Sequence, residues 1–301
     1  KANEMGYLPN MAARALKTKM THNIGVLFID DYHSGLTHPY FAPVLESLKT
    51  EVENLGYDIT FINKNVGGRE MSYLEHCRYR NVDGVVIANV DFTKEEVVEL
   101  VESNIPVVTI DHVFNNCPAV VSDNIKGVRE LTEYVISMGH KKIAYIHGQQ
   151  NSVTKVRLAS FYRTMEEHGL SVPDEYVPEA PYLEGEASSE ATKKLLALKN
   201  PPTCILYPDD YTAIGGIAVI REAGLSIPSD ISVAGYDGIS LIQQFQPKLT
   251  TYAQDMSGIG KAAAQAIVDQ IERPKSALVE MIVKAGVVMP GASVRCLNEN
   301  E

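Results

Sequence analysis

The sequence contains no run of about eighteen or more apolar residues, so neither a transmembrane helix nor a membrane partner is expected. No signal peptide is recognisable, although a chain that begins at Lys1 instead of Met is expected to have been trimmed or processed. Cysteine is scarce, and Cys77, Cys117, Cys204 and Cys296 are widely scattered, which fits a reduced cytoplasm better than a disulfide framework. These absences predict a globular protein of the cytoplasm.

Motifs for catalysis, metal binding and nucleotide binding are also missing. The stretch G-I-G-K-A-A at 258–263 matches a loose dinucleotide fingerprint, but no strong buried strand precedes it. His140 and His147 flank a predicted strand without a third ligand at metal spacing, and Ser152 lies near His147 without a G-x-S-x-G elbow. The sequence therefore predicts no catalytic residue, no metal and no cofactor.

Positive charge is in short supply over most of the chain, whose net charge is −11 at pH 7. Residues 1–22 carry four cations and one anion, a net charge of +3, so the remainder carries −14. Because an acidic surface repels phosphate, any contact with DNA must concentrate in the N-terminal segment.

Short apolar runs, each followed by a helical pattern, recur through the 301 residues. The runs are apolar on both faces, as expected for parallel strands that helices cover on both sides. The predicted strands are 23–29, 59–63, 84–88, 107–110, 142–147, 203–207, 231–236 and 278–283. The predicted helices are 40–55, 71–79, 93–103, 125–138, 156–168, 187–198, 213–222 and 259–271. Two such series predict an α/β protein of two doubly wound parallel-sheet lobes.

Polar side chains follow these strands, where ligands bind in open α/β sheets. They are Asp30, Asp31, Asn89, Asp91, Asp111, Asp123, Asn124, Gln149, Asn151, Asp209, Asp210, Asp237 and Gln254. Arg157 and the rings of His33, His38, Tyr40, Phe41 and Tyr182 accompany them. Carboxylates and amides suit hydroxyl groups, and aromatic faces suit the C–H faces of a sugar ring, so the set indicates a carbohydrate.

Each of these residues has a simpler interpretation as well. Asp210, and one or both of Asp30 and Asp31, fit ordinary helix caps or turn formers. Tyr40 and Phe41 are equally consistent with core residues that open a helix. Arg157 is placed at the start of a helix, where pairing with Glu166 or Glu167 on the surface is the alternative to ligand binding.

The N-terminal stretch carries a more specific signal. Pro9 cannot lie inside a helix, whereas Asn10 can cap the short cationic helix that follows it. The text GYLPNMAARALKTKMTHNIGVLF resembles the hinge of the lactose-repressor (LacI/GalR) family of bacterial transcription regulators. In that family the hinge links a helix-turn-helix head to a sugar-binding core, and here residues 1–6 would be only the tail of the head.

Motifs further along the chain extend this resemblance from about residue 6 to about residue 291. They are H-P-Y-F-A at 38–42, V-R-L-A-S-F at 156–161, P-D-D-Y-T-A-I-G at 208–215, I-S-V-A-G-Y-D-G at 231–238 and T-T-Y-A-Q-D at 250–255. The resemblance implies the pocket residues His38, Tyr40, Phe41, Asp123, Asn151, Arg157, Tyr182, Asp209, Asp237 and Gln254; Asp91 is added from its place after a strand. Asp209 stands where the family commonly has Asn, and Ser160 where Gly is usual. The arrangement of ligand hydroxyl groups that the site recognises therefore stays open.

The resemblance also implies the organisation and the function. It implies a periplasmic-binding-protein-like fold of type I with three crossovers, with a head-and-hinge remnant at 1–20, one lobe at 21–123 plus 255–283, and the other at 124–254 plus 284–301. A small-molecule effector would bind between the lobes and alter operator affinity. In a homodimer, the hinge helix would enter the minor groove with Leu16 as an apolar wedge, while Asn10, Arg14 and Lys17 hold the DNA. Leu16 as a core residue of a packed helix is the alternative.

Two other functions stay open on the sequence alone: a periplasmic sugar-binding protein of a transporter, and an enzyme of the doubly wound class. The hinge-like segment favours the regulator, because a secreted receptor has no use for it. A pentose, a hexose or a sugar acid fits the polar set, a purine fits it less well, and a partner protein as co-effector also stays open.

Overall fold

The computed structural model describes residues 20–30 and 34–298. The predicted hinge residues Asn10, Arg14, Leu16 and Lys17, together with Asp31 and His33, lie outside the described residues. Every helix among the described residues is too short or too polar to cross a lipid bilayer.

The chain divides into two compact units. Unit 1 contains the residues up to Val121 together with Met256–Val283, and unit 2 contains Ser122–Asp255 and the residues from Lys284 onwards. The sequence analysis placed the three changes of lobe after residues 123, 254 and 283, and the structure places them after 121, 255 and 283. The helix predicted at 125–138 belongs to unit 2.

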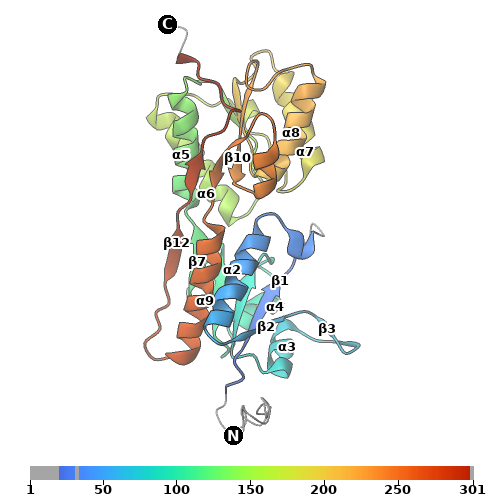
Figure 1. Cartoon of the computed structure of the whole chain (residues 1–301), viewed down its shortest axis with the longest axis vertical. Coiled ribbons are helices and arrows are strands. Elements are labelled where there is room, and N and C mark those ends of the chain that lie inside the picture. Colours follow the sequence, from blue (N-terminus) through green and yellow to red (C-terminus); the bar gives the residue numbers. More distant parts are fainter. Residues whose placement is uncertain (1–19, 31–33, 299–301) are drawn as a thin grey trace, which may run out of the picture. The chain divides into compact units, whose positions relative to one another are not determined.

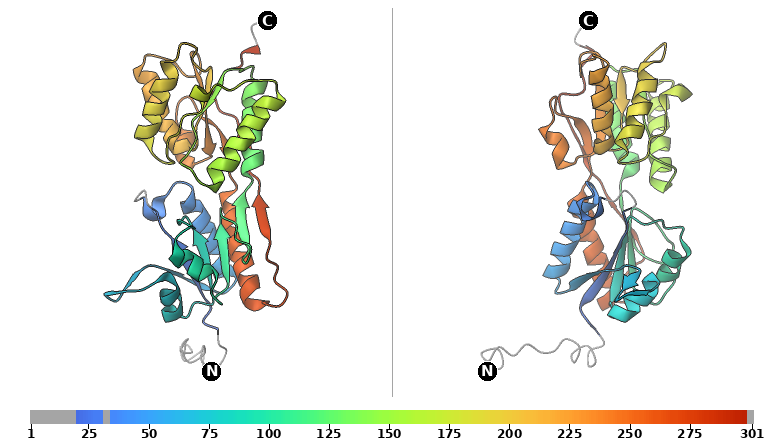
Figure 2. Two further views of the ribbon diagram at one scale, coloured as in Figure 1. Left: turned by 180° about the vertical axis from the view of Figure 1, so that it is seen from behind. Right: turned by 90° about the vertical axis from the view of Figure 1, so that its right-hand side faces the viewer.

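Unit 1 is built on a six-stranded sheet with the strand order β12-β7-β6-β5-β1-β2 (Figure 1). The strands are β1 (Asn23–Phe28), β2 (Asp58–Phe61), β5 (Gly84–Ala88), β6 (Val107–Ile110), β7 (Ala119–Ser122) and β12 (Met281–Lys284). The pairs from β2 through β7 are parallel. Helices α2 (Phe41–Asn54) and α9 (Met256–Glu272) pack together on one face, and α3 (Tyr73–Arg80) and α4 (Glu95–Val101) cover the other face (Figure 2). The short helix η2 (Gly35–Thr37) and the hairpin of β3 (Asn65–Val66) and β4 (Arg69–Glu70) complete the unit.

Unit 2 has a five-stranded sheet with the order β13-β11-β10-β9-β8, in which only the β11–β13 pair is antiparallel. The strands are β8 (Ile143–Tyr145), β9 (Cys204–Leu206), β10 (Ser232–Asp237), β11 (Thr250–Ala253) and β13 (Val287–Met289). Helices α5 (Asn124–Ser137) and α6 (Ser152–Glu167) lie on one side, and α7 (Gly185–Leu196) and α8 (Asp210–Glu222) on the other (Figure 2). The short helices η3 (Asp174–Tyr176) and η4 (Ser240–Gln244) lie in connections. Each unit is therefore the doubly wound α/β layer structure that the sequence predicts.

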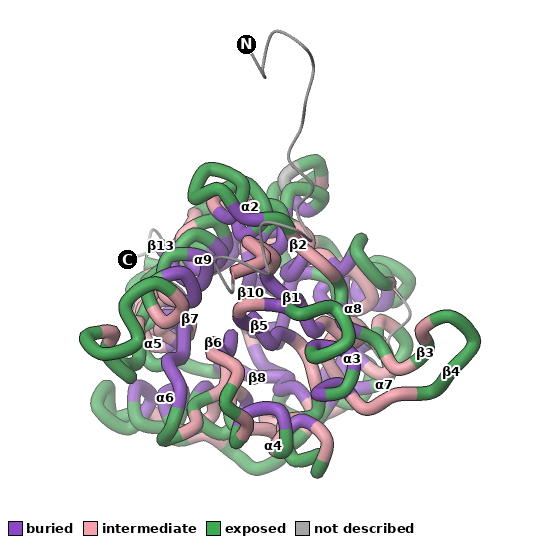
Figure 3. The backbone as a smooth tube through the Cα atoms, turned by 90° about the horizontal axis from the view of Figure 1, so that it is seen from below, coloured by how far each residue is buried: buried purple, intermediate pink, exposed green. Residues whose placement is uncertain are grey.

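Burial follows the strand pattern. Every residue of β5 and of β10 is buried, as expected for central parallel strands that helices cover on both faces. Figure 3 shows buried chain along β1 and β5 and exposed chain along the β3–β4 hairpin. The carboxyl ends of these buried strands are therefore the places where polar side chains can reach solvent or a ligand.

Polar caps decide where three helices of unit 2 begin. Asp123, Asn151 and Asp209 each accept the backbone N–H three residues ahead, at 3.0, 2.7 and 2.7 Å. The spacing of apolar residues alone predicted starts for α6 and α8 that are three to four residues too late. Arg157 is therefore not at the start of its helix, as the sequence indicated, but one and a half turns inside it.

The first described residues are anchored to unit 1 by one carboxylate. Asp83, just before β5, accepts the backbone N–H groups of Thr21 at 3.0 Å and of His22 at 2.7 Å. The Thr21 hydroxyl donates to the carbonyl oxygen of Asn81 at 2.7 Å. Strand β1 follows directly, so the direction in which the chain enters the sheet is fixed at its first turn.

Candidate functional site

Arg157 is a buried charged side chain of unit 2 that is fixed by hydrogen bonds. It is 5% exposed, its Nε donates to Asn124 Oδ1 at 2.7 Å, and its Nη1 donates to the carbonyl oxygen of Pro208 at 2.9 Å. The guanidinium carbon lies 3.8 Å from the centroid of the Tyr236 ring, a cation–π contact. The surface pairing of Arg157 with Glu166 or Glu167 is wrong, because the side chain is buried and Glu167 pairs with Arg129 and Arg163 instead.

Asp237 and Gln254 meet at the ends of β10 and β11. Gln254 Nε2 donates to Asp237 Oδ1 at 2.6 Å, and the Gln254 backbone N–H donates to the Asp237 carbonyl oxygen at 3.0 Å. Burial raises the pKa of Asp237 well above its ordinary value, while Arg157 acts in the opposite direction. Gln254 Oε1 is buried and has no hydrogen-bond partner among the described residues. The pair therefore presents acceptor oxygens that a ligand with hydroxyl donors can satisfy.

Tyr182 supplies an aromatic face beside the same arginine. The centroid of its ring lies 5.8 Å from the Arg157 guanidinium carbon, and its hydroxyl lies 2.9 Å from Thr154 Oγ1. A Cβ atom at Gly148 would overlap the Tyr182 ring, so only glycine allows this approach. Burial raises the pKa of the Tyr182 hydroxyl, which keeps the ring neutral at physiological pH.

Asp209 and Asp210 are both buried, and they do different things. Asp209 caps α8 and also accepts the Leu183 backbone N–H at 3.1 Å. Asp210 is not the cap that the sequence indicated, because its Oδ2 accepts the N–H groups of Gly238 and Ile239 at 2.7 and 2.9 Å and its Oδ1 accepts the Thr251 hydroxyl at 2.6 Å. Burial raises the pKa of Asp210 to about 7. Asp210 thus ties α8 to the turn after Asp237 and to β11.

A second cluster lies in unit 1, where α2 begins. His38, Tyr40 and Phe41 are each 7% exposed. His38 Nδ1 accepts the N–H groups of Tyr40 and Phe41 at 3.3 Å each, and burial lowers the pKa of His38. The Tyr40 hydroxyl donates to Asp111 Oδ2 at 2.8 Å. Phe41 packs edge-on against Phe28 and His38, so it has the core role that the sequence left open, whereas Tyr40 carries its hydroxyl to a strand-end carboxylate.

Four of the polar residues expected at strand ends have evident local roles. Asp91 is exposed and accepts the N–H and the hydroxyl of Thr93 at 3.0 and 2.6 Å. Asp123 and Asn151 are half-buried helix caps. Asp30 accepts the Ser34 hydroxyl at 2.5 Å and the Gly35 N–H at 2.6 Å, as a turn former does, in agreement with its simpler interpretation.

The side chains gathered around Arg157 form the unit 2 cluster. Two of its residues are absent from the predicted pocket. Asn124 was among the strand-end residues, but only the structure shows that it holds Arg157. Tyr236 gave no signal, because a tyrosine inside an apolar strand is indistinguishable from an ordinary core residue until the cation above its ring is seen.

The histidines considered for a metal have protein partners. His140 bonds Thr203 Oγ1 at 2.9 Å and the Arg295 carbonyl oxygen at 3.1 Å, and His147 Nδ1 lies 2.7 Å from the Gly148 carbonyl oxygen. Among residues 20–30 and 34–298, no group of three or more His, Cys, Asp or Glu side chains is arranged to hold a metal ion. The chemistry of the unit 2 cluster is therefore hydrogen bonding and ring stacking around a fixed cation.

Comparison with known families gives the relationship of this chain to other proteins. A family model described as a periplasmic binding protein-like domain matches residues 132–294. The transcriptional repressor PurR of Pasteurella multocida is 30% identical over 285 residues, which cover 92% of this chain and 84% of the relative. The PurR repressor of Histophilus somni is 31% identical over 272 residues, covering 89% of this chain and 80% of the relative. These relatives are regulators and not enzymes, in line with the prediction of no catalytic residue.

Solved structures show the same fold. A LacI family regulator from Enterococcus faecium with bound ribose has a TM-score of 0.78 at 24% identity and covers 91% of this chain and 99% of its own. A complex of the regulator CelR with cellobiose has a TM-score of 0.78 at 21% identity, with 97% and 88% covered. The lac repressor dimer bound to operator and the anti-inducer ONPF has a TM-score of 0.78 at 21% identity, with 96% and 99% covered.

Proposed function

Because this chain belongs to the LacI/GalR family of transcriptional regulators, we propose that it is the effector-binding core of a repressor whose effector is a small carbohydrate. The observation that carries the proposal is the unit 2 cluster, in which Arg157, Asp237, Gln254 and Tyr182 converge at the carboxyl ends of parallel strands. The curated relatives are repressors, which favours a regulator over a transporter receptor.

The chemistry of the cluster suits a polyhydroxylated ligand. A hydroxyl group donates to Gln254 Oε1 or to the Asp237 carboxylate and accepts from the Arg157 guanidinium, while the Tyr182 ring offers a face for C–H groups. Hydrogen bonds to charged groups contribute about 1.5–3 kcal/mol each, so two or three of them define a selective site. The ribose and cellobiose complexes of the similar structures support this ligand class.

The effector acts on DNA through the N-terminal segment in this proposal. Residues 1–22 carry a net +3 on an otherwise acidic chain, which concentrates attraction for phosphate there. Asn10, Arg14 and Lys17 contact the operator, and Leu16 inserts between base steps of the minor groove. The coupling free energy between sugar and operator is about 1–3 kcal/mol and acts equally in both directions.

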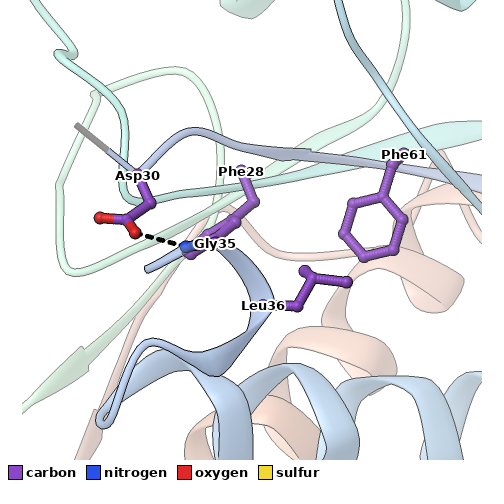
Figure 4. Close-up of a pocket in the computed structure, with 5 residues that line it drawn as sticks. All are labelled: Phe28, Asp30, Gly35, Leu36 and Phe61. Carbon is purple, nitrogen blue, oxygen red and sulfur yellow. Dashed lines mark hydrogen bonds between the residues drawn. The ribbon is translucent and has the colours of Figure 1, made fainter. Parts of the chain in front are cut away.

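A homodimer places two such segments on one operator, and unit 1 offers a surface for it. Strand β2 is an edge strand of the unit 1 sheet, and beside it a groove of about 810 Å³ runs along α2. An adjoining hollow of about 430 Å³ is lined by Phe28, Asp30, Gly35, Leu36 and Phe61 (Figure 4). Leu36 and Phe61 are 57% and 42% exposed and face each other across it. An edge strand beside exposed apolar side chains is a template for a second copy, so we place the dimer contact on α2 and β2.

The ligand site is tested with Arg157→Ala and Asp237→Ala in a thermal-shift screen of D-ribose, D-glucose, D-gluconate and related sugars. Each change removes at least one bond to a charged group, which is expected to raise Kd about 10- to 150-fold. Arg163→Ala is the matched control, because Arg163 lies on the same helix with its side chain 75% exposed.

Arg157→Lys provides a second variant that keeps the buried positive charge, in case the alanine variant is too unstable. Lysine lacks the planar fork that bonds Asn124 and Pro208 together, so sugar binding is expected to weaken in this variant as well. Sugar binding at the parental affinity in both the Arg157 and the Asp237 variants would show that the site is elsewhere.

A further inference from the structure

The loop that carries Tyr182 is held at three points by side chains from other elements. Gln149 Oε1 accepts the Tyr182 backbone N–H at 2.9 Å, Thr154 Oγ1 lies 2.9 Å from the Tyr182 hydroxyl, and Asp209 Oδ2 accepts the Leu183 N–H at 3.1 Å. Leu183 has φ = +60°, a left-handed conformation that disfavours a leucine. A loop in this conformation needs external bonds to stay in place, and these three supply them.

Each carboxylate oxygen of Asp209 accepts a backbone N–H group. Its Oδ1 accepts the Thr212 N–H at 2.7 Å as the cap of α8, its Oδ2 accepts the Leu183 N–H, and the residue is 2% exposed. The same carboxylate therefore joins the first turn of α8 to the Tyr182 loop. Of these three contacts only the one with Asp209 reaches α8, and it adds to the bonds from Ser188 and Ser189 of α7, the helix that follows the loop, to α8.

We propose that Asp209 is a positioning residue, which fastens the Tyr182 loop to α8 and so sets the aromatic wall beside Arg157. The consequence for ligand choice rests on the proposed function, whereas the fastening itself does not. The position of the Tyr182 ring would then help to select the width of the carbohydrate.

The donor and acceptor pattern explains why aspartate and not asparagine fits here. Both oxygens of Asp209 receive backbone N–H groups, so an asparagine in either orientation would turn its own N–H towards one of them and leave that donor unpaired. Asp210 is different, because its Oδ1 receives the Thr251 hydroxyl, which can rotate and accept instead. An asparagine at 210 keeps every hydrogen-bond partner of Asp210. Asp210→Asn is therefore a matched control for Asp209→Asn, because both variants make the same chemical change.

Hydrogen exchange of the ligand-free protein, read by mass spectrometry on peptides that cover 181–185 and 210–216, tests the proposal. In Asp209→Asn the Leu183 amide is expected to exchange at least tenfold faster, and in Asp210→Asn it is expected to exchange as in the parent. Asp209→Ser keeps a side-chain oxygen that caps α8 but reaches only one donor. It is expected to free the loop and to leave the amides of α8 protected.

An unchanged Leu183 amide in Asp209→Ser, or faster exchange confined to α8, would overturn the proposal and leave Asp209 as a helix cap alone. Equal loosening of the loop in Asp210→Asn would overturn it too, since the effect would then be general to the α8 start. No sugar enters this experiment, so its failure and a failure of the carbohydrate assignment are seen separately.

Discussion

Two neighbouring tyrosines in the core of unit 2 differ in one respect that stability measurements can isolate. The rings of Tyr236 and Tyr252 lie 5.1 Å apart, and the residues are 2% and 0% exposed. The Tyr252 hydroxyl accepts the Gly286 N–H at 2.8 Å, whereas the Tyr236 hydroxyl is buried without a hydrogen-bond partner among the described residues. Replacing each by phenylalanine removes one oxygen atom from nearly the same surroundings.

The two changes are expected to have opposite signs. A buried polar group without a partner costs about 1–3 kcal/mol, so Tyr236→Phe relieves that cost and is expected to stabilise the protein by about 1 kcal/mol. The Arg157 contact survives, because it uses the face of the ring and not the hydroxyl. Tyr252→Phe leaves the Gly286 N–H unpaired and is expected to destabilise by about 1–3 kcal/mol.

Urea unfolding followed by far-ultraviolet circular dichroism measures the difference. With a denaturant slope of about 2–3 kcal/mol per M, Tyr236→Phe raises the midpoint by about 0.4 M, and Tyr252→Phe lowers it by about 0.3–1.5 M. Exchange of the β10 and β11 amides reports on unit 2 alone, which matters in a chain of two units. A loss of stability in Tyr236→Phe equal to that in Tyr252→Phe would refute the reasoning.

Two further predictions concern the titration of Asp210 and the proposed dimer contact. Because the pKa of Asp210 in the folded protein, about 7, lies above its value in an unfolded chain, the folded state binds the extra proton between about pH 4 and 7, and stability falls as pH rises through that range. Asp210→Asn is expected to flatten this slope by up to about 1.4 kcal/mol per pH unit, measured by urea midpoints at several pH values; an unaltered slope would mean that Asp210 does not titrate there. At the proposed dimer contact, Phe61→Ser is expected to weaken association about tenfold or more, because a two-fold symmetric contact contains each substitution twice. Light scattering at tens of micromolar protein measures this change. Leu278→Ser, at a side chain 69% exposed elsewhere on unit 1, is the control, and a parent protein that stays monomeric would contradict the dimer.

The alternation of buried apolar runs and helical stretches was sufficient to predict the doubly wound layers. The central strands β5 and β6 were placed with their observed bounds, because parallel strands covered on both faces leave an uninterrupted apolar signature. Strands β7, β11 and β13 were not placed, because they are three or four residues long and partly polar or half-exposed. The starts of α6 and α8 were placed late, because polar residues dominate the first turn after each cap.

The site was predictable in part. Polar residues at the expected strand ends included Asp237 and Asp209, which act electrostatically on each other and on Arg157, and Gln254, which bonds Asp237; their role in ligand binding stays a prediction. The sequence did not show which of two adjacent carboxylates caps α8 and which reaches across to Gly238, Ile239 and Thr251, since that depends on contacts between residues about 28 to 41 positions apart. It also did not show that Arg157 lies on a tyrosine ring.

The anchor at the start of β1 has a consequence for which positions can vary. Asp83 grips main-chain N–H groups, and every residue except proline supplies one. A substitution at position 21 therefore removes the hydroxyl bond to Asn81 but leaves the main-chain bonds to Asp83 in place. Both main-chain contacts of this junction depend on a single acidic residue some sixty positions away.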